Sequence, residues 1–339
     1  MAGAGWVNSL FPEQVSSRWG SADQDVLGTN YRSLDLELRP DSEGALTATL
    51  VRRACLPDEE QPVRAVLYVH GFVDYFFQTH LADAWAAAGY TFYALDLRKH
   101  GRSLRPHHTP NFVTALADYD EELDAAVRII RGEDGHSSLT VMGHSTGGLV
   151  VSLWANRRQF EAVIDAVVLN SPWFDLNAGL FMRTLGTSAV HALGRLAPMR
   201  RVGGLGPEYP RSIHQDFGGS WDYNLSWKPH EGFPVRAGWL SAVRRGHAQI
   251  ARGLELDCPV FVAYAARSAT SRSSRAEISS ADVVLDVGHI AQGGPKLGNL
   301  VTCVRVAGGI HDLTLSAEPS RGRFFAELMR WQETYVPRR

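Results

Sequence analysis

The sequence predicts an α/β protein with a mostly parallel sheet that is covered by helices on both faces. Short apolar runs alternate with stretches at helical spacing, and the runs show no polar alternation, as is typical of strands buried on both faces. Helical crossovers between such strands require a parallel sheet. The expected strands of this kind are Arg64–His70, Tyr90–Asp96, Leu139–Gly143, Ala166–Asn170, Pro259–Ala263 and Leu300–Val306.

An antiparallel hairpin is expected to precede these strands. The extended stretches Tyr31–Glu37 and Ala45–Arg53 are joined by the turn-rich segment Pro40-Asp41-Ser42-Glu43-Gly44. Helices are expected between the later strands. They lie around Leu81–Ala88, Tyr119–Arg131 and Gly147–Arg157, with a last one at Arg321–Tyr335, whose apolar stripe contains Phe324, Phe325, Leu328 and Trp331.

One segment interrupts the alternation and predicts an insertion that covers an edge of the sheet. From about Asn177 to Leu254 the chain is rich in Gly, Pro, Trp and Arg and contains no clear βαβ unit. We therefore expect a core made of residues 1–176 and 255–339, with residues 177–254 as a cap or lid. The first part of the cap is expected to be an amphipathic helix, since Phe181, Leu185, Ala189 and Leu193 recur at helical spacing.

Composition excludes several classes of protein. The chain has 339 residues, 45% of them hydrophobic, and a formal net charge of −2, so no global positive field would attract nucleic acid. It contains no apolar run of the roughly 18 residues that a membrane helix needs. The opening stretch Met1–Phe11 lacks the pattern of a secretory signal, which favours the cytoplasm. The sequence does not indicate the oligomeric state.

Metal and thiol chemistry are not indicated either. The three cysteines, Cys55, Cys258 and Cys303, are far apart and form no CxxC pair, so neither a disulfide framework nor a thiolate zinc site is expected. The adjacent pair His107-His108 has no carboxylate at ligand spacing and is interpreted as part of a loop. We expect no metal and no cofactor.

The segment Gly143-His144-Ser145-Thr146-Gly147 has the form G-x-S-x-G and predicts a nucleophile elbow. It follows a strand candidate and opens a helix candidate, which is the setting that such an elbow requires. A serine at so tight a turn has strained backbone angles, and side chains at positions 143 and 147 would collide with the neighbouring strand and helix. Ser145 is therefore the candidate nucleophile, and His144 is expected to point away from it and pack.

A serine hydroxyl needs a base, and His311 is the best candidate. Histidine is the side chain whose ordinary pKa lies near neutral pH. His311 follows the last expected strand, where a loop can return it to the carboxyl edge of the sheet. Its place after the serine and an acid also fits the chain order that accompanies this elbow.

The third group must be a carboxylate between Ser145 and His311, which fixes the imidazole tautomer. Asp282, beyond the strand Pro259–Ala263, is the preferred acid, and Asp286 is the alternative. Asp257 precedes that strand and so belongs to the opposite edge of the sheet.

Two backbone N–H groups are expected to form an oxyanion hole. His70-Gly71-Phe72 closes an expected strand, and glycine there lets the backbone approach a substrate. The N–H of Phe72 and the N–H of Thr146 would then stabilise a developing oxyanion, each worth roughly 10²–10³ in rate.

These segments together resemble the α/β-hydrolase superfamily. The set HGF, DLRKHGRS, GHSTGG, NSPWFDL, SADVV and GGIHDL is most similar to the monoacylglycerol lipase and lysophospholipase group, also called serine aminopeptidase S33-type hydrolases. The resemblance extends from about Tyr31 to Tyr335. It implies an α/β-hydrolase fold with an eight-stranded sheet, a cap inserted after the sixth strand, and a triad of Ser145, Asp282 and His311. The long Ser/Arg-rich stretch Tyr264–Ala281 before the acid departs from the family pattern.

The predicted function is hydrolysis of small to medium lipidic or aryl carboxylic esters, like monoacylglycerols or lysophospholipids, through an acyl-enzyme on Ser145. Leu180, Phe181 and Leu185 are expected near the pocket mouth. There are two alternatives. The first is an aminopeptidase or amidase, with Asp216, Asp222 and Glu231 as possible anchors for a substrate amine. The second is a non-catalytic binding protein on this fold. The cap aromatics are expected mostly to pack rather than line an acyl channel: Phe217, Trp221, Tyr223, Trp227, Phe233 and Trp239.

Overall fold

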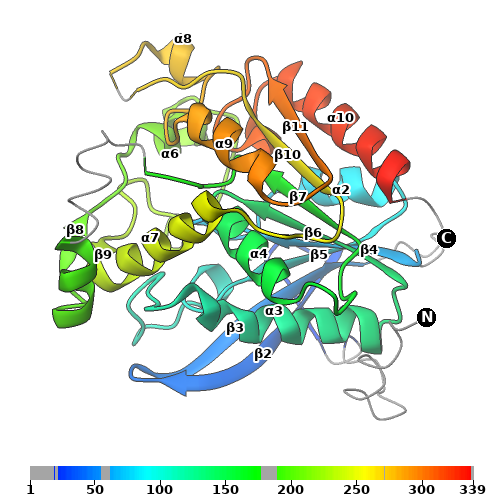
Figure 1. Cartoon of the computed structure of the whole chain (residues 1–339), viewed down its shortest axis with the longest axis horizontal. Helices are drawn as coiled ribbons and strands as arrows, with labels where there is room; N and C mark the ends of the chain where they lie inside the picture. The colour runs from blue at the N-terminus through cyan, green and yellow to red at the C-terminus, as the bar shows by residue number, and fades with distance from the viewer. Residues whose placement is uncertain (1–18, 20–21, 55–61, 177–188, 271, 337–339) are drawn as a thin grey trace.

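A single large sheet forms the centre of the molecule (Figure 1). The computed structural model describes residues 19, 22–54, 62–176, 189–270 and 272–336. In that part of the chain the sheet has nine strands in the order β1-β2-β3-β5-β4-β6-β7-β10-β11. Their bounds are Asp23–Gln24 (β1), Tyr31–Asp41 (β2), Gly44–Arg53 (β3), Arg64–Val69 (β4), Thr91–Asp96 (β5), Ser138–His144 (β6), Ala166–Asn170 (β7), Val260–Ala265 (β10) and Val301–Val306 (β11).

The predicted α/β architecture is confirmed. The hairpin β2–β3 pairs antiparallel with β5, and every pairing from β5 to β11 is parallel. All residues of β4, β5, β6, β7 and β10 are buried, which explains their unbroken apolar sequences. The eight expected strands are present, and the two-residue β1 extends the sheet at the edge beyond β2.

Helices cover both faces of the sheet (Figure 1). One core cluster joins the sheet to α3, α4, α7 and α9, and a second joins its other face to α2 and α10. The predicted stripe on α10 is confirmed, because Phe324, Leu328 and Trp331 are buried in the second cluster. The bounds are Thr79–Ala87 (α2), Asp120–Val127 (α3), Thr146–Arg157 (α4), Glu208–Ile213 (α6), Ala237–Arg252 (α7), Arg275–Ile278 (α8), Val287–Gly293 (α9) and Ser320–Tyr335 (α10).

Shorter helical turns complete these layers. The expected helix over Tyr119–Arg131 is α3 followed directly by a π-helical turn at Arg128–Glu133. Turns of 3₁₀ helix lie at Gly101–Ser103, Leu116–Tyr119, Gln215–Phe217, Gly294–Lys296 and Leu313–Leu315.

The predicted cap segment lies between β7 and β10. It contains α6, α7 and a small antiparallel pair, Arg201–Gly203 (β8) with Val235–Arg236 (β9). Residues 189–196 are helical, whereas Phe181 and Leu185 of the predicted amphipathic helix lie outside the described residues. Helix α7 packs Trp239, Val243 and Ile250 into the main core, so the segment is continuous with the core there. The division of the chain at residues 177 and 254 stays a prediction.

Helix α7 also holds a histidine whose burial predicts a pH dependence of stability. Burial, followed by the charge of Arg244, lowers the pKa of His247 to about 3. Between pH 6.5 and 3 the unfolded chain takes up a proton at this position that the folded protein does not, so the free energy of unfolding should fall by about 1 kcal/mol for each pH unit of acidification. Urea unfolding followed from pH 7 to 5 measures this slope.

The matched variants for that measurement are His247→Gln and His107→Gln. His247→Gln should have a shallower slope of unfolding free energy against pH, because the titrating group is gone. His107 is exposed, and its replacement should leave the slope as in the parent. Equal slopes in all three proteins would contradict the assignment to His247.

No helix in the described part of the chain combines the length and the apolar character needed to cross a membrane.

Candidate active site

Ser145 lies at the turn between β6 and α4, in the strained conformation that the elbow predicts. Its φ is +53° and its ψ is −118°, and its main-chain N–H donates to the Asn170 carbonyl at 3.1 Å. A Cβ added to Gly147 would lie 2.2 Å from the His70 carbonyl oxygen, and one added to Gly143 would lie 2.7 Å from the Gly147 oxygen. The two flanking positions therefore accept only glycine, because the strand, turn and helix are in contact there.

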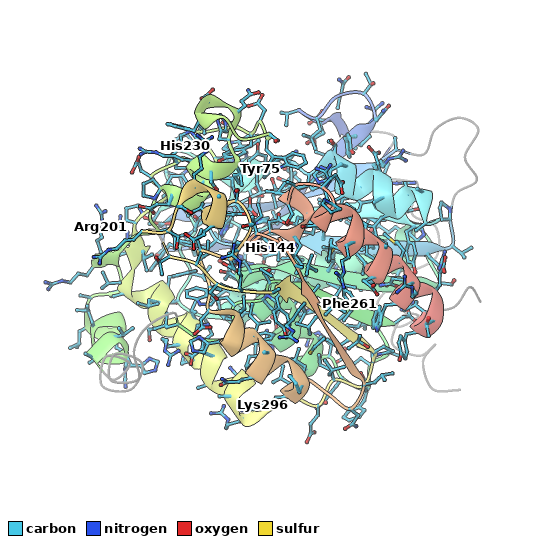
Figure 2. All side chains as sticks on the ribbon, turned by 90° about the horizontal axis from the view of Figure 1, so that it is seen from above. Tyr75, His144, Arg201, His230, Phe261 and Lys296 are labelled. Carbon is cyan, nitrogen blue, oxygen red and sulfur yellow. The ribbon has the colours of Figure 1, made fainter. Side chains whose placement is uncertain are left out.

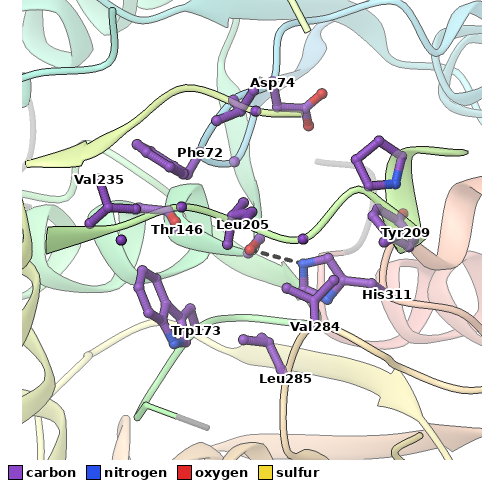
Figure 3. Close-up of a pocket in the computed structure, with 18 of the residues that line it drawn as sticks. Phe72, Asp74, Thr146, Trp173, Leu205, Tyr209, Val235, Val284, Leu285 and His311 are labelled. Carbon is purple, nitrogen blue, oxygen red and sulfur yellow. Dashed lines mark hydrogen bonds between the residues drawn. The ribbon is translucent and has the colours of Figure 1, made fainter. Parts of the chain in front are cut away.

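The tertiary structure brings together the three side chains that the sequence selected. His311 Nε2 lies 3.0 Å from Ser145 Oγ, and His311 Nδ1 lies 2.9 Å from Asp282 Oδ2 (Figure 3). Ser145, His311 and Asp282 are 8%, 4% and 0% exposed, so this chain of hydrogen bonds is shielded from water. The low local dielectric strengthens such bonds, and the geometry matches that of a serine, histidine and carboxylate triad.

Asp282 reaches His311 despite the long stretch that precedes it. The chain leaves the sheet after β10, forms α8 and returns, so that Ser268 and Asp282 pair as a parallel bridge. The carboxylate oxygen that does not face His311 accepts the N–H groups of Val284 and Leu285, both at 2.8 Å. Because Asp282 pairs with Ser268, shortly after β10 ends at Ala265, the acid lies close to the end of that strand. The backbone N–H groups of Val284 and Leu285 set its orientation.

The alternative acids lie elsewhere. Asp286 caps α9 by accepting the Gly288 N–H at 2.8 Å and is 46% exposed at its side chain. Asp257 accepts the N–H of Phe160 at 2.8 Å. Asp312 is next to His311 in sequence, but its carboxylate accepts hydrogen bonds from Asn170 and Thr314. Among the described acids, Asp282 is the one hydrogen-bonded to His311.

A cavity of about 420 Å³ opens onto Ser145 and His311. Gly71, Phe72 and Thr146 line it, and a Cβ on Gly71 would lie 3.1 Å from Ser145 Cβ, so the loop after β4 runs directly over the serine. Thr146 is the first residue of α4, and the N–H groups of a first helical turn have no partner within the helix. The surroundings are those expected of an oxyanion hole, and the donor roles of Phe72 and Thr146 stay predictions.

The histidine beside Ser145 is part of the cavity wall. His144 is buried, lines the cavity, and lies with its ring 4.9 Å from that of His311, while its Nδ1 lies 3.0 Å from the Asn170 carbonyl. Burial lowers the pKa of His144, with Asp312 opposing the shift and His311 adding to it. A neutral ring is therefore favoured at this position, which fits the predicted packing role better than a second base.

The cavity wall contains residues that sequence reasoning missed. Apolar side chains from the core and from the cap segment meet here, and Phe72 stacks on Trp239 with ring centroids 4.0 Å apart. Buried Asp74 and Lys228 form an ion pair with Oδ1 and Nζ 2.6 Å apart. In Figure 3 Trp173 and Val235 lie on one side of the hydrogen bond to His311, and Tyr209 lies on the other. The motifs HGF, NSPWFDL and SADVV, which contain or lie close to Asp74, Trp173 and Val284, were the available signals. Glu208 and Tyr209 lie in α6 and Val235 lies in β9, within the cap segment. The wall residues not predicted include Asp74, Trp173, Glu208, Tyr209, Lys228, Val235 and Val284.

The cap residues that were considered as substrate contacts can be compared with the lining of the cavity. Leu180, Phe181 and Leu185 lie outside the described residues, so their predicted role stays a prediction. Of the six cap aromatics, Trp239 lines the cavity and the other five do not. Tyr223 is buried and Trp221 and Trp227 pack against the same cluster, as expected for most of them, whereas Phe217 is 43% exposed. None of the three acidic residues suggested as amine anchors lines the cavity either. The acidic side chains of the wall are instead Asp74 and Glu208.

The fold and this arrangement of a serine, a histidine and a carboxylate are those of an α/β-hydrolase. A family model described as serine aminopeptidase, S33, matches residues 60–268, which is more than half of the chain. The chain therefore belongs to this family of hydrolases. The resemblance seen in the motifs of the sequence is thereby confirmed.

Two curated proteins show which members are similar in sequence. The chain is 31% identical over 145 residues to a monoacylglycerol lipase of Mycolicibacterium smegmatis, an alignment that covers 42% of this chain and 48% of the relative. It is 28% identical over 118 residues to phospholipase YtpA of Bacillus subtilis, covering 34% and 43%. The chain thus spans about half the length of the curated relatives it matches.

The fold is also that of solved structures. One is a soluble variant of monoglyceride lipase from Saccharomyces cerevisiae in complex with a substrate analogue, with a TM-score of 0.63, 14% identity and 88% and 94% of the two chains covered. Another is a thermostable carboxyl esterase from Bacillus coagulans in complex with glycerol, with a TM-score of 0.63, 13% identity and 90% and 99% covered. At these identities the likeness concerns the fold.

Proposed function

We propose that the protein is a serine hydrolase that cleaves carboxylic esters of small to medium lipidic or aryl type, similar to monoacylglycerols or lysophospholipids. One observation carries the proposal. Ser145, His311 and Asp282 are joined by hydrogen bonds of 3.0 and 2.9 Å at the wall of a largely apolar cavity. The names of the curated relatives, a monoacylglycerol lipase and a phospholipase, give it further support.

The proposed reaction has two halves. His311 Nε2 removes the proton of Ser145 Oγ as the oxygen attacks the ester carbonyl, and the N–H groups of Phe72 and Thr146 stabilise the oxyanion. His311 then gives its proton to the leaving alcohol, which leaves an acyl group on Ser145. Water, activated by His311, hydrolyses that acyl-enzyme and restores the serine. Asp282 holds the ring with Nδ1–H toward itself and stabilises the imidazolium.

The lining of the cavity favours an ester with an apolar acyl group over a charged amine. Phe72, Trp173 and Trp239 form a continuous aromatic wall, with ring centroids 4.0 and 5.8 Å apart. Asp74 is neutralised by Lys228, so it offers little net charge to an ammonium group. A monoacyl chain would bury its methylene groups against that wall, at about 0.8 kcal/mol each.

A panel of substrates tests the proposal. We expect kcat/KM to rise with acyl length from acetate to medium-chain nitrophenyl esters and to be far lower for aminoacyl anilides. An aminopeptidase would prefer the anilides and would depend on an acidic anchor, for which Glu208 in the wall is the candidate. If anilides are preferred and Glu208→Gln removes that preference, the ester proposal is wrong. A binding protein would turn over neither class. The predicted cytoplasmic location stays a prediction.

A further inference from the structure

A second group of reactive side chains lies in the cap segment, outside the proposed catalytic site. His214, Asp216 and His230 each offer a ligand atom, and these atoms lie within 4.8 Å of one another. His214 follows the end of α6, and Asp216 lies two residues further along the chain, in the short turn Gln215–Phe217. His230, which is labelled in Figure 2, lies in the loop that precedes β9, and the two imidazole rings have centroids 4.7 Å apart.

His214 is buried and His230 is half-buried, and both have polar atoms without a partner among the described residues. His214 is 2% exposed, and its Nε2 has no hydrogen-bond partner among the described residues. Both ring nitrogens of His230 are also shielded from solvent without a partner in that part of the chain. Buried polar groups in folded proteins nearly always find a partner, so these nitrogens require an explanation. A bound cation would provide one for His230, because a neutral imidazole nitrogen is a good ligand for a transition metal.

The orientation of His214 fits metal binding through Nδ1. Nδ1 accepts the Asp216 N–H at 3.2 Å, which places the proton on Nε2; an ion bound at Nδ1 would take the single lone pair that now accepts this local hydrogen bond. Nδ1 also lies 3.5 Å from Asp216 Oδ2, close to the spacing of about 3.3 Å between two ligands of a tetrahedral zinc ion. Nε2 faces Asp222 Oδ1 at 3.7 Å, which is the place of the outer carboxylate that commonly orients a metal-bound histidine.

We propose that the protein binds a divalent zinc ion through His214, His230 and Asp216, with Asp222 as the outer partner of His214. Two imidazoles and one carboxylate are a zinc ligand set, with a fourth position for water. The Asp216 and Asp222 side chains are 59% and 71% exposed, so the ion can enter from solution. This inference goes beyond the proposed ester hydrolysis and does not depend on it.

Zinc at this position would join two segments of the cavity wall. Tyr209 and Pro210 line the cavity shortly before His214, and Lys228 and Pro229 line it directly before His230. A bond from each histidine to one ion would therefore hold these two segments together. The ion would act on the shape of the cavity and would take no part in the reaction at Ser145.

Equilibrium dialysis of the untagged full chain against zinc chloride, followed by metal analysis, tests the site. We expect one zinc ion per chain, and a rise in the unfolding temperature with zinc because the ion binds the folded state. His230→Gln should lose the ion. Asp216→Asn should weaken binding at least about tenfold, since even outer partners of metal ligands are commonly worth that much. His107→Gln is the matched control and should bind zinc like the parent.

The design separates a local binding defect from misfolding. Asp216 is exposed, so Asp216→Asn should have the parent's unfolding temperature in the absence of zinc and differ from it only when zinc is added. Zinc that is retained equally by the parent, His230→Gln and Asp216→Asn would be bound elsewhere, for example at His311, and would overturn the proposal. Absence of retained zinc in the parent would overturn it as well.

Discussion

Replacing Ser145 by alanine is expected to reduce kcat for ester hydrolysis by roughly 10⁶-fold, because the nucleophile and the acyl-enzyme are both lost. The Oγ atom that His311 Nε2 contacts at 3.0 Å is the only polar atom removed by this change. Alanine should fit the strained turn no worse than serine, since both side chains have the same Cβ. The folded state should therefore persist. Steady-state assays with a nitrophenyl ester measure the loss of kcat. A fluorophosphonate probe should no longer label the protein.

The matched control is Ser152→Ala. Ser152 is a buried serine on the same helix whose Oγ donates to the Gly148 carbonyl at 2.7 Å, and it does not line the cavity. This variant should keep the parent's kcat and its labelling. Undiminished labelling of Ser145→Ala would mean that another residue is the nucleophile and would remove the basis of the proposed function.

Asp282→Asn is expected to lower kcat by roughly 10⁴-fold with little change in the fold. The asparagine carbonyl can still accept the N–H groups of Val284 and Leu285, so its NH₂ group must face His311 Nδ1. The ring then takes the tautomer with the proton on Nε2, and it can no longer accept the proton of Ser145. Rates measured at saturating ester isolate this effect on kcat from any effect on binding.

Asp286→Asn is the comparison that the sequence itself suggests, since Asp286 was the alternative acid. Its side chain caps α9 through the Gly288 N–H, and asparagine is an equally good cap. We expect the parent's kcat and a stability change within about 0.5 kcal/mol. A large loss of activity in Asp286→Asn with a small one in Asp282→Asn would reverse the assignment of the acid.

Most of the sheet could be predicted because its strands carry a local signal. The runs around Arg64–Val69, Thr91–Asp96 and Ser138–His144 are apolar throughout, and the strands are buried on both faces. The two-residue β1 had no such signal, because both of its residues are exposed and its pairing depends on β2. In the cap segment, α7 does carry a periodic signal, with Trp239, Val243 and Ile250 buried at helical spacing. The loops around His214 and His230 had no such signal, because contacts with other parts of the chain hold them.

The residues of the candidate site also differ in how far the sequence alone could identify them. Ser145 was identified because the requirement for Gly143 and Gly147 is local and appears in the sequence as a pentapeptide. His311 required a longer argument, from its place after the last strand. Asp282 and Asp286 could not be separated, because which carboxylate faces His311 depends on how residues 266–281 leave the sheet and return to pair at Ser268. The pair Asp74 and Lys228, 154 positions apart in the chain, had no signal in either segment alone.

The order of apolar runs, the glycines of the tight turn and the chemical types of the side chains were enough to establish the α/β architecture, the family resemblance and the candidate nucleophile and base. The acid facing His311, the mixed apolar and ion-paired wall of the cavity, and the meeting of His214 with His230 came from the folded arrangement alone. The physical reason is the range of the interactions. Strand burial and a strained turn depend on neighbours in the chain, whereas hydrogen bonds and ion pairs between distant loops exist only after packing has brought those loops together.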